Sequence, residues 1–286
     1  MANLKEIRNR ISSVSSTMQI TSAMKMVSAA KLKKAQDAIT AMRPYANKLT
    51  ELLQNLSATL DADSGSKYAT QREVKKVLIV AITSNRGLCG AFNSNIIKEA
   101  NRLANETYEN QEVSFVAIGK KANDALSKNG EVIFNNSDVF EDLTFDNVAE
   151  IAEMLMEKFV EGEFDKIEID YNKFKNAATQ IVMTEQFLPI VPMEGNSNSN
   201  QDYIFEPTKV EIVETLIPKS LKTQLYKSIR DSFASEHGAR MTAMHKATDN
   251  ATELRDQLKL TYNKARQAAI TNEILEIVGG AEALNN

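Results

Sequence analysis

The sequence has very little of what builds disulfide, zinc-bound or membrane-spanning frameworks. One Cys, no Trp and two His occur among 286 residues. A single Cys cannot form an internal disulfide, and the Cys and His lack zinc-ligand spacing, so we expect a reducing compartment and no structural zinc. No apolar run approaches the roughly 18 residues of a membrane span, and charged residues begin at Lys5. We therefore expect neither a secretory signal nor a transmembrane helix.

Helix-breaking residues are also scarce at both ends of the chain: they are Pro44 in the first 64 residues, and Pro218 and Gly238 between 208 and 278. This scarcity predicts two very long helices, Asn3 to Ser57 and Thr208 to Val278, with the second ending at Gly279 and Gly280. At about 1.5 Å per residue they would be rods of roughly 80 and 105 Å, too long for a small domain to bury.

Apolar residues in both predicted helices step by three and four, which is the seam of a coiled coil. In the first helix the seam is Leu4, Ile7, Ile11, Val14 and Met18, then Ile20, Met24 and Val27, and later Leu49, Leu53, Leu56 and Leu60. In the second it is Met241, Met244, Thr248, Ala251, Leu254, Leu258, Thr261, Ala265 and Ala268, then Ile270, Ile274 and Ile277. We predict that the helices pair as an antiparallel coiled coil that serves as a mechanical shaft; two separate helical bundles are the alternative.

The middle of the chain has a different pattern. Val74–Thr83 is a near-continuous Val/Ile/Leu strand, typical of a parallel sheet buried on both faces. Further strands are predicted at 113–118, 132–134, 166–174 and 178–188, with helices at 93–108, 120–128 and 146–161 and a polar loop at 194–202. The last two strands form a predicted hairpin. The fold class is thus α/β plus a long antiparallel coiled coil, with a three-layer, Rossmann-like α/β domain (73–205) inserted between helical arms at 1–72 and 206–286.

Charge is unevenly distributed. Residues 1–60 hold nine Lys or Arg and three Asp or Glu, whereas residues 61–207 carry a net charge of −11. A basic arm often marks a partner of opposite charge, with nucleic acid as the first suspect, and a simple solvated helix face is an equal alternative.

The most site-like segment is Thr83–Asn93 (TSNRGLCGAFN), a turn from the end of a buried strand into a helix. Phosphates bind at such helix N-termini. The segment lacks the third Gly of a dinucleotide loop and the Lys-Ser/Thr of a P-loop, so a nucleotide site is not favoured. Cys89 has no nearby His, and we expect a small buried thiol rather than a nucleophile. His237 and His245 are poorly spaced on one helix for a shared metal.

Methionines are frequent along both arms, where Met18, Met24, Met26 and Met42 would face Met241 and Met244. Such a stripe can be a promiscuous binding surface, but filling of the helix seam is the favoured interpretation.

Several blocks of sequence closely resemble the γ subunits of rotary ATP synthases. They are KEIRNRISSV, MQITSAMKMVSAAKLKKAQ and RPYA in the first arm, TSNRGLCGAFN in the middle, and ASEHGARMTAMHKATDNATEL and LTYNKARQAAITNEILEIVGGAEAL in the last arm. The remainder of the middle domain is similar in layout more than in residues.

The resemblance implies a non-catalytic rotor subunit in the central stalk of a proton-translocating ATP synthase. It would transmit torque from the membrane c-ring to the catalytic β subunits and couple ion flow to ATP synthesis or hydrolysis. The implied partners are the hexameric ring of α and β subunits, the ε subunit and the c-ring, with no cofactor, metal or nucleic acid. The implied location is peripheral, on the cytoplasmic face of a bacterial cell membrane. Chloroplast relatives add a regulatory Cys pair, and with Cys89 alone no redox switching is expected.

The resemblance also implies partner contacts, residue by residue. Met24 and Lys25 would lie near an acidic lever of β, with Arg240 contributing from the other helix. Arg266 and Gln267 would hydrogen-bond a β loop, with Thr271 and Glu273 close by. Ile274–Leu284 would be a tip in an apolar collar, and Tyr203 and Glu206, in YIFEP, would lie at the foot that contacts ε and the c-ring.

Two other classes of function remain open from the residues alone. One is a coiled-coil tether or nucleic-acid-binding scaffold that uses the basic arm, which steeply salt-dependent DNA affinity would support. The other is a small α/β enzyme with helical dimerisation arms, which a ligand bound at Arg86–Gly90 would support.

Overall fold

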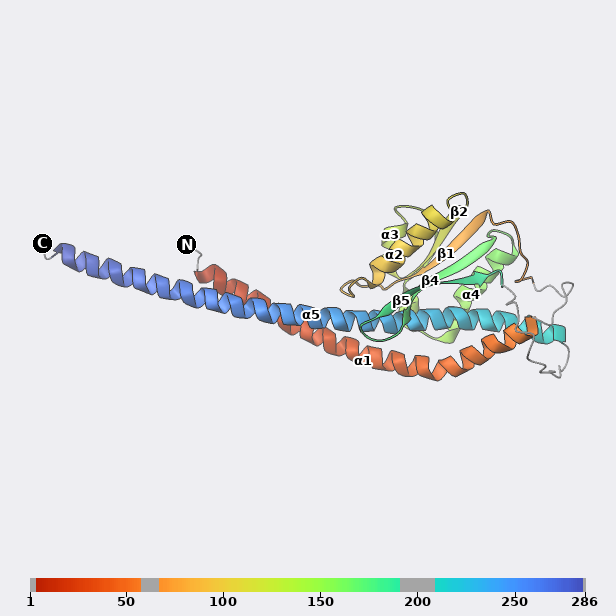
Figure 1. Cartoon of the computed structure of the whole chain (residues 1–286), viewed down its shortest axis with the longest axis horizontal. Coiled ribbons are helices and arrows are strands. Elements are labelled where there is room, and N and C mark those ends of the chain that lie inside the picture. The colour runs from red at the N-terminus through yellow and green to blue at the C-terminus, as the bar shows by residue number, and fades with distance from the viewer. Residues whose placement is uncertain (1–3, 58–66, 191–208, 285–286) are drawn as a thin grey trace. The chain divides into compact units, whose positions relative to one another are not determined.

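The computed structural model describes residues 4–57, 67–190 and 209–284, with side chains described except at 47, 50–57, 209–214 and 282–284. The chain divides into two compact units, and Figure 1 labels its helices and strands. One comprises Met1–Ser28 with Met241–Asn286, and the other comprises Ala29–Arg240. The predicted loop at 194–202 and the side chains of Leu53, Leu56 and Leu60 lie outside this description.

The unit of residues 29–240 contains a five-stranded sheet in the order β3-β2-β1-β4-β5. The strands are β1 (Lys76–Ile82), β2 (Glu112–Ile118), β3 (Glu131–Asn136), β4 (Lys166–Phe174) and β5 (Gln180–Leu188). Strands β1 to β4 are parallel, and β5 runs antiparallel to β4 as the predicted hairpin. Central β1 is buried from Val77 to Ile82, which explains its unbroken Val/Ile/Leu/Ala sequence.

The shorter helices of this unit follow the predicted positions closely. They are α2 (Phe92–Arg102), continued by the π-helical turn η2 (Leu103–Thr107), α3 (Lys120–Leu126), the 3-10 turn η3 (Asp138–Phe140) and α4 (Phe145–Val160). Helix α4 begins where the Thr144 hydroxyl accepts a hydrogen bond from the Asn147 N–H, a standard helix N-cap.

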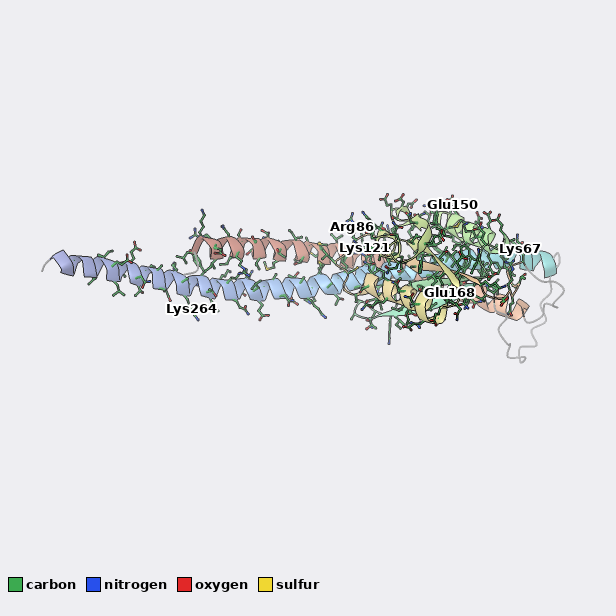
Figure 2. All side chains as sticks on the ribbon, turned by 90° about the horizontal axis from the view of Figure 1, so that it is seen from above. Lys67, Arg86, Lys121, Glu150, Glu168 and Lys264 are labelled. Carbon is green, nitrogen blue, oxygen red and sulfur yellow. The ribbon has the colours of Figure 1, made fainter. Side chains whose placement is uncertain are left out.

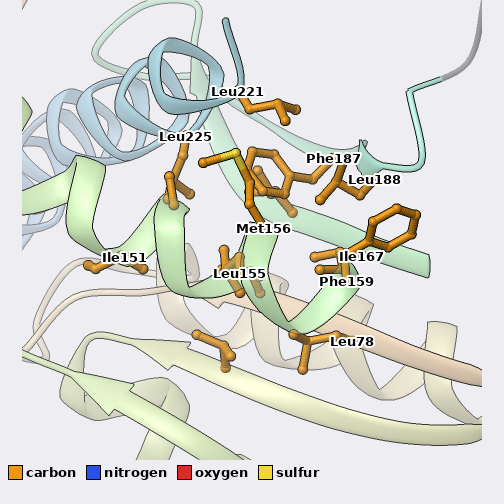
Figure 3. Close-up of a cluster of buried hydrophobic side chains, with 14 of the residues drawn as sticks. Leu78, Ile151, Leu155, Met156, Phe159, Ile167, Phe187, Leu188, Leu221 and Leu225 are labelled. Atoms are coloured by element: carbon orange, nitrogen blue, oxygen red, sulfur yellow. The ribbon is translucent and has the colours of Figure 1, made fainter. Parts of the chain in front are cut away.

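Helices cover both faces of the sheet. Val77, Ile79 and Ala81 pack with apolar residues of α2 and α3. Leu78, Val80 and Ile82 point to the opposite face and pack with α4 and with a long helix, α5. Figure 3 shows this second core, in which Met156 of α4 lies beside Leu225 of α5, and Leu155 and Phe159 of α4 belong to the same buried cluster. The long C-terminal helix is therefore part of the sheet's own hydrophobic core.

The two long helices are confirmed as α1 (Leu4–Ser57) and α5 (Lys209–Leu284). The predicted stop of the second helix at Gly279 and Gly280 is wrong, because α5 continues to Leu284. A glycine ends a helix when it adopts positive φ, and the described glycines with positive φ are Gly90, Gly119 and Gly162. Gly279 and Gly280 keep helical geometry instead.

In the other unit, residues 4–28 of α1 pair antiparallel with α5. The Arg8 guanidinium donates to the Tyr262 hydroxyl (2.8 Å), and the Thr21 and Thr248 hydroxyls share a hydrogen bond of 2.8 Å. The partner's residue number falls as the α1 number rises, which fixes the antiparallel direction. Ile7, Thr21, Ser28, Met244 and Ala251 are the buried residues of this pairing.

The predicted seam of α1 is correct as far as Met18 and then wrong at Ile20 and Val27, which are 60% and 58% exposed. The buried or half-buried positions continue instead as Thr21, Lys25, Ser28, Leu32, Ala35, Ile39, Met42, Ala46 and Leu49. These steps alternate strictly between three and four, as in a coiled-coil seam. Polar residues therefore occupy some seam positions, and the prediction had given these positions to larger apolar neighbours.

The seam of α5 shows the same correction. Leu254 is 41% exposed. Thr261 is also exposed, whereas Arg255 and Tyr262 are half-buried. The seam is Met241, Met244, Thr248, Ala251, Arg255, Leu258, Tyr262 and Ala265, again stepping by three and four without a break. Arg255 and Tyr262 fit because their polar ends bond Met18 Sδ and Arg8 of α1.

Candidate partner-contact site

The turn that follows β1 is filled by its own side chains. The Ser84 backbone N–H donates to Asn93 Oδ1 (2.9 Å), and the Ser84 hydroxyl donates to the Arg86 carbonyl (2.6 Å). Asn93 Nδ2 donates to the Ser84 hydroxyl (2.9 Å). The side chains of Ser84 and Asn93 therefore bond one another and the backbone of the turn.

Cys89 lies inside this turn as the buried thiol that the sequence predicts. It is 1% exposed and packs with Phe92 of α2 and Ala239 of α5. Burial raises the pKa of its thiol, although the hydroxyl of Ser84 and the charge of Arg240 act in the opposite direction. A thiol held neutral is a poor nucleophile.

The two histidines have unrelated environments. His237 is buried, its ring meets that of Phe233 edge-on at 4.5 Å, and both of its ring nitrogens lack a hydrogen-bond partner among the described residues. Burial, together with the charges of Arg240 and Lys31, lowers its pKa to about 3. His245 is exposed and lies 3.3 Å from Asp249. Within the described ranges, no group of three or more His, Cys, Asp or Glu side chains is arranged to hold a metal ion.

Arg240, predicted as a partner contact, is buried at 7% exposure and is engaged within the chain. Its Nη1 donates to Glu236 Oε1 (2.5 Å), and its Nη2 donates to the carbonyl of Arg86 (3.2 Å). Glu236 was not singled out from the sequence, although its i,i+4 spacing to Arg240 is the usual signal for a helical ion pair.

Six of the other predicted contact residues lie in the unit that contains Met1–Ser28 and Met241–Asn286. Met24 and Lys25 are half-buried on α1. Arg266, Gln267, Thr271 and Glu273 are all exposed on α5. At about 100° per residue these four side chains span roughly 160° of the helix, so they share one face. Tyr203 and Glu206 lie outside the described residues.

The last turns of α5 expose large apolar side chains. Every residue from Arg266 to Ala281 is exposed, and Figure 2 shows side chains standing out from α5 around Lys264. Exposures of 48 to 67% are found at Ile270, Ile274, Leu275, Ile277 and Val278. Contiguous exposed apolar surface of this kind marks an interaction site, because a soluble helix gains stability by burying such side chains. Within the described residues, no helix is both long enough and apolar enough to cross a membrane.

Known proteins resemble the chain over its whole length. The family model described as ATP synthase matches residues 3–284. The ATP synthase gamma chain of Flavobacterium psychrophilum is 78% identical over 285 residues, covering 99% of both chains. That of Flavobacterium johnsoniae is 77% identical over 288 residues and covers both chains completely.

Solved structures agree in fold. A chain of the Tetrahymena thermophila mitochondrial ATP synthase central stalk and c-ring is 26% identical with a TM-score of 0.61, covering 80% of this chain and 99% of that one. A chain of the Euglena gracilis mitochondrial ATP synthase rotor is 23% identical with a TM-score of 0.67, covering 93% and 98%. The family match and the two bacterial relatives together establish that the chain belongs to the ATP synthase gamma chains.

Proposed function

We propose that this chain is the rotor subunit in the central stalk of an ATP synthase. It transmits torque from a membrane c-ring to catalytic β subunits and couples proton flow to ATP synthesis or hydrolysis. The observation that carries the proposal is the exposed apolar end of α5, in a chain whose relatives are ATP synthase gamma chains and whose structural neighbours include a rotor. Such an end requires a partner that surrounds it.

The chain has two parts in the proposed architecture, a shaft and a foot domain. Residues 1–72 and 206–286 form an antiparallel coiled-coil shaft, and residues 73–205 form a three-layer, Rossmann-like foot domain. Support comes from the unbroken three–four seams of α1 and α5 and from helices on both faces of the sheet. The chain contributes no catalytic residue of its own to the H+-transporting ATPase complex, and the self-filled turn after β1 supports this assignment.

The proposed partners are the α and β subunits of the ring, the ε subunit and the c-ring, at the cytoplasmic face of a bacterial membrane and peripheral to it. Exposure of Arg266, Gln267, Thr271 and Glu273 leaves them available to a β loop. Lys25 and Met24 would meet an acidic segment of β, for which the net positive charge of residues 1–60 is complementary. Arg240 belongs to the same set, but its 7% exposure limits any such contact to the edge of its side chain.

Co-purification tests the function directly. A tagged chain expressed in its native host should recover α and β subunits with ATPase activity, and a tagged chain that recovers neither would overturn the proposal. A variant with Ile274→Glu and Ile277→Glu places two charges on the exposed end and should lower recovery of the ring several-fold. Asn272→Glu, which changes an exposed polar residue on the same turns, is the matched control and should recover the ring as the unmodified chain does.

A further inference from the structure

A buried ion pair lies at the last two turns of the α5 stretch that belongs to the unit of residues 29–240. Glu236 and Arg240 are 8% and 7% exposed, and their charged atoms are 2.5 Å apart. Buried charges persist in proteins when they are paired and hydrogen-bonded, and removal of one partner is far more disruptive than at a surface. The pair therefore contributes to the stability of this part of α5.

The same guanidinium extends across to the turn that follows β1. Arg240 Nη2 donates to the Arg86 carbonyl at 3.2 Å and to the Gly87 carbonyl at 3.4 Å, while Nη1 holds Glu236. The planar fork of an arginine places N–H groups of two separate nitrogens on an acid and on two carbonyls, whereas a lysine ammonium carries its three N–H groups on one compact nitrogen and cannot occupy both positions. The pair thus connects α5 to a segment that precedes it by about 150 residues.

The turn held in this way contains a strained residue. Leu88 has a φ of 63°, a left-handed conformation that is unfavourable for leucine, and its side chain is 64% exposed. Immediately after it, Cys89 is 1% exposed and packs with Phe92 and Ala239. An unfavourable backbone conformation persists when surrounding contacts over-determine it. Arg240 supplies such contacts on the two carbonyls that precede Leu88.

We propose that Glu236 and Arg240 are positioning residues that latch the 84–93 turn onto α5 and so determine where this helix is released from the α/β domain. Arg240 is the last residue of its unit, and Met241 begins the other. With the latch closed, α5 moves with the sheet as one body up to residue 240. With the latch open, the terminal turns of that stretch gain torsional freedom. The consequence for torque transmission rests on the proposed rotor function, whereas the latch itself does not.

Cys89 makes the latch measurable, because it is the only cysteine of the chain and lies under the turn. Modification of the full-length chain by a maleimide should be slow. Arg240→Lys keeps a positive charge for Glu236 but cannot serve both carbonyls, and should raise the modification rate at least tenfold. Glu236→Gln keeps an acceptor for Arg240 and should raise it by a smaller factor. If circular dichroism shows that Arg240→Lys does not fold, the modification rate of Glu236→Gln decides whether the latch exists.

Arg230 provides the matched control. It is another α5 arginine whose guanidinium donates to a backbone carbonyl of the α/β domain, that of Leu143 at 2.6 Å. Arg230→Lys should leave the Cys89 modification rate within twofold of the unmodified chain. The latch is overturned if the folded Arg240→Lys and Glu236→Gln chains react at the unmodified rate, or if Arg230→Lys accelerates the reaction equally.

Assembled complexes test the consequence. Arg240→Lys should lower the ATP synthesised per ion translocated while ATP hydrolysis is retained, a split that a general loss of folded protein would not produce. If the chain fails to co-purify with an ATPase ring, the rotor function fails, but the Cys89 modification rates still decide the latch. If the variant accelerates Cys89 modification and leaves coupling unchanged, the latch stands and its role in torque is refuted.

Discussion

Asp170 of β4 is a carboxylic acid buried where a charge is poorly tolerated. It is 0% exposed, and one of its oxygens accepts a hydrogen bond from the Thr184 hydroxyl at 2.7 Å. Its second oxygen lacks a hydrogen-bond partner among the described residues. The pKa of Asp170 is raised to about 7. Burial is the largest cause of the rise, the charges of Glu168 and Glu99 add to it, and the Thr184 hydrogen bond and the charge of Arg102 act in the opposite direction. Asp170 is consequently half-protonated in the folded chain near neutral pH.

The sign and size of the effect on stability follow from this pKa. Between pH 4 and 7 the unfolded chain has released the Asp170 proton, whose ordinary pKa is 3.8, while the folded chain still holds it. Stability therefore falls as pH rises through this window, and the loss levels off above pH 7. The difference between 3.8 and about 7 corresponds to on the order of 4 kcal/mol at pH 8, of which about 2.5 kcal/mol is lost between pH 5 and 8.

Asp170→Asn removes the titration and keeps an acceptor for Thr184. In urea unfolding of the full-length chain, we compare the free energy of unfolding of the variant with that of the unmodified chain. The variant's value minus the unmodified chain's value should be about 2.5 kcal/mol larger at pH 8 than at pH 5. Asp124→Asn, at a carboxylate whose side chain is 44% exposed, is the control and should show little pH-dependent difference. A stability difference for Asp170→Asn that stays constant from pH 5 to 8 would refute the reasoning.

Three further predictions rest on the helices. His237→Leu removes two buried ring nitrogens without partners and should stabilise the chain by about 1–3 kcal/mol at pH 7. The stability difference should grow at pH 5, because the buried imidazole, with a pKa of about 3, stays neutral while the unfolded one is protonated below pH 6.5, and the unmodified chain loses stability. Equal losses of stability in both chains between pH 7 and 5 would contradict this. Arg266→Ala with Gln267→Ala should weaken coupled ATP synthesis with helicity retained, since both side chains are exposed, and loss of helicity by circular dichroism would instead indicate a packing role. A double-mutant cycle of Thr21→Val and Thr248→Val should give a coupling energy of about 0.5–1.5 kcal/mol in urea unfolding, and additivity would argue against the shared hydrogen bond.

The helices and strands were predictable because their signals are local. The Val/Ile/Leu run of β1 and the scarcity of Pro and Gly in the arms located the elements to within a few residues. The helix seams were predicted less well. The prediction assigned seam positions to the largest apolar residues and so chose Ile20 and Val27. The buried residues are their neighbours Thr21 and Ser28. The Thr21 hydroxyl shares a hydrogen bond with the Thr248 hydroxyl of the facing helix, a partner that the spacing within one helix does not reveal.

Among the candidate site residues, the four on α5 from Arg266 to Glu273 are exposed, and their contacts with a β loop stay a prediction. Arg240 is buried instead. The motif around Arg240 suggested an external contact, and the structure places its guanidinium on Glu236 and on two carbonyls of the turn after β1. These carbonyls are backbone atoms, so no side-chain pattern could have indicated them.

The sequence by itself determined the two long helices, the α/β pattern between them, the uneven charge and the family resemblance, because each depends on neighbouring residues or on the order of motifs. Only the tertiary structure decided that α5 completes the core of the sheet through Leu221 and Leu225. It also decided that Asp170 is buried with one oxygen that has no partner among the described residues, and that Arg240 donates to carbonyls of the 84–93 turn. The physical reason is common to all three. Burial and hydrogen-bond partners depend on which distant segments meet, and periodicity along one segment carries no information about its neighbour in space.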